Sequence, residues 1–286
     1  MMDELYLPDQ GDGSYRNPVL CCDYSDPDVI RVGDTYYMTA SSFNYVPGLP
    51  ILTSADLVNW RLVNYALPNI PEPGYEIPRH ACGVWAPAIR WHDGFFYIYY
   101  GMPDEGIYMV RAADACGQWD APKLVRAGKG LIDPCPFWDD DGRAYVIHAY
   151  ANSRIGFKSR IGIFPMSADG THAIGEDKFL FDGTANHPTI EGPKVYKQDG
   201  WYYIFAPAGG VATGWQTVLR SRRIDGEYED RIVLRQGNSR VNGPHQGAWV
   251  TAADGSDWFI HFQSRGLYGR CLLYTSPSPR DRQKSR

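Results

Sequence analysis

Three carboxylates of this 286-residue chain stand at matching places before a recurring glycine turn. Asp26, Asp133 and Glu191 precede the glycine of such a turn by 7, 9 and 9 residues. Each opens an apolar stretch bounded by Pro or Gly, where a lone carboxylate is costly unless it is paired or used. A single Asp-Pro more often caps a turn, but three carboxylates at similar offsets indicate side chains that face one common axis.

Carboxyl groups arranged in this way suit the hydrolysis of a glycosidic bond. One carboxyl group protonates the leaving oxygen, and a second activates water or attacks as a nucleophile. A third can keep the acid protonated through the proximity of like charge and can fix its orientation. For an inverting reaction we expect the acid and the base to lie about 6.5–9.5 Å apart.

The glycine turns belong to a repeat that must position these side chains. A turn followed by an alternating, aromatic strand occurs five times, with its glycine at positions 33, 94, 142, 200 and 255, spaced 48 to 61 residues apart. Glycine permits the positive φ of a tight hairpin turn. Five units of about fifty residues predict an all-β, five-bladed β-propeller whose fifth blade is incomplete. A β-sandwich, the alternative, would lack the fifty-residue recurrence.

Composition and charge narrow the range of partners. The net charge of −5 argues against nucleic acid and against an anionic membrane surface, and no apolar run is long enough to span a bilayer. The 20 Tyr and 9 Trp suit stacking against sugars, although most of them fill sheet cores. The N-terminus lacks a secretory pattern, so we expect a cytoplasmic protein, and the six Cys show no metal-ligand spacing. We expect an oligosaccharide as its partner.

The character of the sequence changes abruptly at Cys271. The last sixteen residues, CLLYTSPSPRDRQKSR, are basic and polar and resemble a translated sequencing adaptor. We therefore expect residues 1–270 to form the propeller catalytic domain. Residues 271–286 are expected to be an artefactual tail, a poorly ordered strand or coil without designed partners.

Around the three carboxylates the chain resembles glycoside hydrolase family 43, from about residue 17 to residue 270. The resemblance is carried by SDPDVIRVGDTYYM, IDPCPFWDDDG and IEGPKVYKQDGWYY. It implies that Asp26 is the general base, Glu191 the general acid and Asp133 the residue that modulates the pKa of the acid. It further implies an inverting β-xylosidase or α-L-arabinofuranosidase that releases terminal xylose or arabinose from xylan, arabinoxylan or arabinan.

Four further positions match the surroundings of the sugar in that family. They are Phe43 in SSFNYVPGLPI, Trp85 in VWAPAIR, His245 in NGPHQGAWV and Arg270 in LYGR. The resemblance implies that all four bind substrate. It implies no required cofactor, and it allows a structural calcium that His245 would hold through water molecules.

Three other interpretations remain open at this stage. A non-catalytic sugar-binding propeller would be expected to lack one of the carboxylates, and all three are present. An inactive fragment of an enzyme has the same motifs as an active one. A retaining hydrolase of fructans needs a different motif around its N-terminal Asp, which SDPDVIR does not resemble. The motifs do not separate xylosidase from arabinofuranosidase, because the shape of the pocket makes that choice.

Overall fold

The computed structural model describes residues 7–238, 243–265 and 270–277, with side chains described as far as residue 263. Its strands form five antiparallel sheets. The first consists of β1 (Asp28–Val32), β2 (Thr35–Thr39), β3 (Gly48–Ser54) and β4 (Arg61–Leu67). The second consists of β5 (Trp85–His92), β6 (Phe95–Met102), β7 (Gly106–Ala112) and β8 (Lys123–Ala127).

The remaining three sheets repeat this plan. The third consists of β9 (Leu131–Trp138), β10 (Ala144–Tyr150), β11 (Arg160–Met166) and β12 (Lys178–Asp182). The fourth consists of β13 (Lys194–Gln198), β14 (Trp201–Ala208), β15 (Trp215–Ser221) and β16 (Glu229–Arg235). The fifth has three strands, β17 (His245–Thr251), β18 (Asp257–Arg265) and β19 (Arg270–Pro277).

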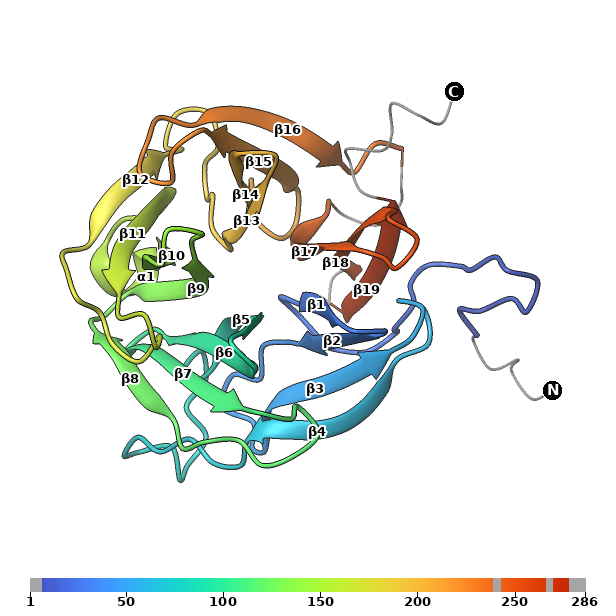
Figure 1. Ribbon diagram of the computed structural model, residues 1–286, viewed down its shortest axis with the longest axis horizontal. Helices are drawn as coiled ribbons and strands as arrows, with labels where there is room; N and C mark the ends of the chain where they lie inside the picture. Colours follow the sequence, from blue (N-terminus) through green and yellow to red (C-terminus); the bar gives the residue numbers. More distant parts are fainter. Residues whose placement is uncertain (1–6, 239–242, 266–269, 278–286) are drawn as a thin grey trace.

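The five sheets are the blades of a propeller, as the repeats predict. The first strand of each blade, β1, β5, β9, β13 or β17, lies nearest the centre of the ring (Figure 1). Contacts join β1 to β5, β5 to β9, β9 to β13 and β14 to β17, and β17 meets β1 to close the circle. Each innermost strand therefore begins at one end of the propeller axis and finishes at the other.

Apolar side chains hold neighbouring blades together. Five hydrophobic clusters lie between successive blades, and their largest fully buried members include Tyr99, Tyr100, Phe164, Phe205 and Phe259. Burial of this surface stabilises the ring. The described residues contain a single short helix, α1 (Asn152–Ile155), and no helix that is long and apolar enough to cross a membrane.

The recurring glycines have the backbone conformation that their turns require. Gly33, Gly94, Gly142, Gly200 and Gly255 have φ between 60° and 83°. Each lies in the turn between the first and second strand of its blade. The turn ends the innermost strand and so fixes how far each strand extends along the axis.

The part of the predicted tail that the structure describes forms a strand at the edge of the fifth blade. The backbone of β19, which includes residues 271–277, pairs with β18 from Arg265↔Arg270 to Trp258↔Pro277. The outer edge of β18 presents unpaired N–H and C=O groups, and an extended segment satisfies them whatever its origin. Among the described residues the fifth blade has three strands, whereas each of the other blades has four. The artefactual origin of residues 271–286 stays a prediction.

Candidate active site

The predicted catalytic side chains gather at the end of the axis where the innermost strands begin. Asp26 lies two residues before β1, Asp133 is the third residue of β9, and Glu191 lies three residues before β13. Trp85 opens β5 and His245 opens β17. All five blades thus contribute to one end of the propeller, which we call the catalytic end.

The backbone at the catalytic end explains the matching offsets. Asp26 and Asp133 each directly precede a proline and each has φ of 55°. In the fourth blade Gly192 takes this place, also with φ of 55° and also before proline, so Glu191 stands one residue earlier. Left-handed backbone at a non-glycine residue costs energy and is often found at functional sites.

Asp26 is held by a hydrogen-bond relay from the neighbouring blade. The Ser41 hydroxyl donates to Oδ2 of Asp26 at 2.5 Å, and the backbone N–H of Ala86 donates to the Ser41 oxygen at 2.8 Å. Burial raises the pKa of Asp26. The Ser41 hydrogen bond acts in the opposite direction, as do the electrostatic interactions with His245 and, to a smaller extent, Lys194. The relay leaves Oδ1 of this carboxylate as the acceptor that Ser41 does not occupy.

Asp133 is almost completely enclosed, with 2% of its surface exposed. Its Oδ2 accepts a hydrogen bond of 2.7 Å from the backbone N–H of Gly192, the residue after Glu191. Burial raises the pKa of Asp133 well above its ordinary value, and the negative charges of Glu191 and Asp26 raise it further. Asp133 is thus tied to the chain beside Glu191 and interacts electrostatically with both other carboxylates.

Glu191 is the more accessible partner of a buried histidine. Its side chain is 24% exposed, and Oε1 is hydrogen-bonded to Nε2 of His245 at 3.0 Å. His245 itself is 1% exposed and packs edge-on against Phe262, with the ring centroids 5.5 Å apart. The contact fixes one oxygen of Glu191 and leaves the other free to reach a substrate.

Two predicted aromatic residues lie side by side at the same end. Phe43 pairs through its backbone with Val84, the residue before Trp85. The guanidinium of Arg154 lies 5.5 Å from the centroid of a Trp85 ring, and Nε1 of Trp85 is buried without a hydrogen-bond partner among the described atoms. The side chain of Arg270 lies outside the described residues.

Comparisons with known proteins identify the family. The model of glycosyl hydrolases family 43 matches residues 15–277. The chain belongs to this family. A protein of Xylanibacter ruminicola with a β-xylosidase name is 50% identical over 265 residues, which cover 92% of this chain and 48% of that protein.

Two further relatives agree with this assignment. "Xylosidase/arabinosidase 43B" of Humicola insolens is 32% identical over 284 residues, which cover 90% of this chain and 51% of that protein. The crystal structure of xylan β-1,4-xylosidase from Bacillus halodurans C-125 superposes with a TM-score of 0.82 and 28% identity, covering 92% of this chain and 54% of that one. The chain spans about half the length of the curated relatives it matches.

Three residues at the catalytic end of this family 43 propeller were not found from the sequence. They are Ser41, Lys194 and Gln246. Lys194 has no exposed surface, and neither its Nζ nor Oε1 of Gln246 has a hydrogen-bond partner among the described atoms. A Cβ added at Gly192 would lie 2.7 Å from Cδ of Gln246, so only glycine fits beside that side chain. Nothing within IEGPKVYK distinguishes Lys194 from a solvated lysine, so no sequence signal indicates this cluster.

The donor set around His245 does not fit a calcium site built from protein ligands. Calcium takes six to eight oxygen ligands. His245 offers ring nitrogens, one of which is already bonded to Glu191, and the described residues contain no group of three His, Cys, Asp or Glu that could hold a metal ion. A calcium held by His245 only through water stays a prediction.

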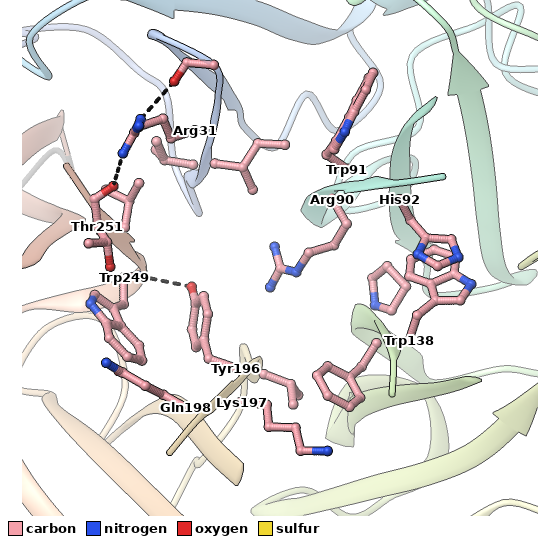
Figure 2. Close-up of a pocket in the computed structure, with 17 residues that line it drawn as sticks. Arg31, Arg90, Trp91, His92, Trp138, Tyr196, Lys197, Gln198, Trp249 and Thr251 are labelled. Carbon is pink, nitrogen blue, oxygen red and sulfur yellow. Dashed lines mark hydrogen bonds between the residues drawn. The ribbon is translucent and has the colours of Figure 1, made fainter. Parts of the chain in front are cut away.

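A cavity of about 720 Å³ opens at the opposite end of the axis. Figure 2 shows its walls, which come from the far ends of the innermost strands, with the Arg90 side chain between them. Arg31 donates to the carbonyls of Gly33 and Thr251, and Nη1 of Arg90 donates to Oδ2 of Asp28 at 2.6 Å. Among the described residues, no Asp or Glu lines this cavity. It is therefore separate from the carboxylate site, and we call it the far cavity.

Proposed function

We propose that this propeller is an inverting glycosidase that releases terminal xylose from β-linked hemicellulose oligosaccharides. One observation carries the proposal: three carboxylates from three blades meet at one end of the axis, and each is held by a different partner. The names of the Xylanibacter and Bacillus relatives support xylose as the sugar. The hydrogen bonds of each carboxylate suggest its role.

Asp26 acts as the general base. Ser41 holds Oδ2, so Oδ1 is the atom that takes a proton from a water molecule at the anomeric carbon. The water then attacks from the face opposite to the leaving oxygen, which inverts the configuration. Because the base must be ionised, the Ser41 hydroxyl, which lowers the pKa of Asp26 against the effect of burial, supports turnover on the acidic side of the pH range.

Glu191 acts as the general acid. His245 fixes Oε1, which leaves Oε2 to deliver the proton to the leaving oxygen. The backbone tie between Gly192 and Asp133 holds the start of β13 in place, so that Glu191 keeps its position during the reaction. Asp133 transfers no proton in this mechanism. Its role is to orient the acid through Gly192 and to place a third carboxyl group beside it.

Arabinose is the second candidate for the released sugar. The Humicola relative is named for both xylosidase and arabinosidase activity. Aromatic walls such as Phe43 and Trp85 pack against the apolar faces of either pentose. The two activities therefore have to be compared on the same protein.

The test is release of nitrophenol from aryl β-xyloside and aryl α-L-arabinofuranoside. We expect the β-xyloside to be the better substrate and Glu191→Ala to lose activity on it. Glu227→Ala, which removes an exposed glutamate from a loop of the same blade, serves as the matched control and should retain it. A soluble, cooperatively melting wild-type chain that hydrolyses neither glycoside would contradict the proposal and favour a non-catalytic sugar-binding propeller or an inactive fragment.

A further inference from the structure

Lys194 is a completely buried lysine that the mechanism above does not require as an acid or a base. None of its surface is exposed, and its Nζ has no hydrogen-bond partner among the described atoms. Lysine is almost never fully buried without a partner, because removing an ammonium group from water is costly. Because the burial of Lys194 costs desolvation free energy, we expect this residue to have a functional role.

The neighbours of Lys194 place it beside the catalytic carboxylates. It follows Glu191 by three residues and opens β13. On one side of it, Gly192 donates to Oδ2 of Asp133 at 2.7 Å, and on the other, the N–H of Val195 donates to Sγ of Cys135 at 3.3 Å. Both contacts join β13 to β9. Lys194 is thus held in the seam between the strand that follows the acid and the strand that contains Asp133.

The charge of Lys194 reaches two carboxylates at once. It lowers the pKa of Asp26 and that of Asp133, each of which burial raises. The other charged or titratable groups that face Asp26 at this end are Glu191, Asp133 and His245, and His245 also lowers the pKa of Asp26. Arg90, which lines the far cavity, forms an ion pair with Asp28 at 2.6 Å. Three carboxylates therefore share this end with one buried lysine.

We propose that Lys194 is a positioning residue that supplies the resident positive charge of the catalytic end and keeps Asp26 ionised. The proposal rests on the function proposed above, in which Asp26 is the base. Lys194 acts through Asp26 and not on the substrate.

The first test is the pH profile of kcat/KM for Lys194→Met. A charged neighbour within a few ångströms changes a carboxyl pKa by about one to three units. Without Lys194, Asp26 holds its proton to higher pH, so the acidic limb should move upward by about one unit. Activity on that limb should then fall roughly tenfold. Lys197→Met is the matched control: Lys197 lies on the same strand but pairs with Asp139 and Asp140 at its outer end, and the limb should not move.

A purely structural role for Lys194 gives a different result. Lys194→Met would then lower the melting temperature and leave the acidic limb where it is, which would overturn the proposal. Lys194→Arg keeps the charge and should restore the limb. If these variants do not fold, the pH profile of the wild-type enzyme provides the test. EDTA should leave the acidic limb of its kcat/KM profile in place. A limb that moves on chelation would assign the positive charge to a metal ion.

A titration without turnover separates this proposal from the proposed function. The ¹³C signal of the Asp26 carboxyl, assigned by its loss in Asp26→Asn, reports ionisation directly. We expect its midpoint to rise by about one pH unit in Lys194→Met. An unchanged midpoint would refute the role of Lys194 even in an active enzyme. A raised midpoint in a chain that hydrolyses no glycoside would refute the function alone.

Discussion

The two ends of the propeller axis are built from the same five strands and differ in how their polar groups are satisfied. At the catalytic end, polar atoms of Trp85, Lys194, His245 and Gln246 are buried without partners in the described structure. None of the residues that line the far cavity has such an atom. Its cations are engaged instead: Arg90 with Asp28, and Lys197 with Asp139.

The difference in buried polar atoms without partners distinguishes the proposed substrate site from the far cavity. Unpartnered buried groups lower stability, and they persist where substrate or reaction uses them. The left-handed backbone at Asp26 and Asp133 adds strain at the same end. These features support the proposed assignment of the catalytic end as the substrate site and a structural role for the far cavity.

The largest effect is expected for removal of the base. Asp26→Asn keeps the shape of the side chain but cannot accept the proton of water, so kcat/KM on an aryl β-xyloside should fall on the order of 10³-fold. Arg31→Gln in the far cavity should change it less than twofold. Comparable losses in both variants would remove the functional distinction between the two ends.

A smaller and substrate-dependent loss is expected for Glu191→Gln. The variant cannot donate a proton, so xylobiose, with its poor leaving group, should lose about 10²–10³-fold in kcat. A dinitrophenyl xyloside, whose leaving group needs little protonation, should lose far less. Equal losses on the two substrates would show that Glu191 is not the acid.

Asp133→Asn should change stability and activity in opposite directions. Because the pKa of Asp133 is raised in the folded protein, its ionised form is disfavoured there, and wild-type stability falls as pH rises from the unfolded value near 4. At pH 7 the neutral variant should gain on the order of 1 kcal/mol, or roughly 2–4 °C in melting temperature, while turnover drops. The gain should shrink as the pH is lowered toward 4. Thermal melts across this range provide the check, and a variant that melts lower at pH 7 would argue against a destabilising buried charge.

Ser41→Ala should have a milder effect that depends on pH. The hydroxyl bonds to the ionised form of Asp26, so its loss raises the pKa of that base and moves the acidic limb of kcat/KM upward by a fraction of a unit to about one unit. Well above the limb, activity should change only a few-fold. A shift toward lower pH would reverse the assigned direction of the relay.

The smallest effect on catalysis is expected for Trp91→Ala at the rim of the far cavity. Trp91 is 42% exposed and packs edge-on against Phe96 with 4.5 Å between ring centroids. The variant should lose about 1 kcal/mol of stability and less than twofold in kcat/KM. Urea unfolding and steady-state kinetics on the same preparation would reveal any catalytic role for this end.

The fold could be predicted because its repeat is local. A glycine turn and an alternating strand recur in each blade, and the turn chemistry alone places the innermost strands. The three carboxylates were predictable for the same reason, since the Asp-Pro and Glu-Gly-Pro starts of the strands impose one backbone conformation.

Contacts between blades could not be predicted in this way. The hydrogen bonds of Ala86 to Ser41 and of His245 to Glu191 join residues 45 and 54 positions apart, in different blades. The burial of Lys194 depends on how the blades pack, and no pattern within IEGPKVYK reports it. The pairing of β19 follows from an open sheet edge and not from any preference visible in the tail itself.

The most direct test of the central claim is the configuration of the sugar when it is first released. Proton NMR of the anomeric signals during hydrolysis of an aryl β-xyloside distinguishes the two possibilities. With Asp26 activating water opposite to Glu191, α-xylose should appear first and the β-anomer only later through mutarotation. Initial release of β-xylose would contradict this account, because it requires a nucleophile where the structure provides a base.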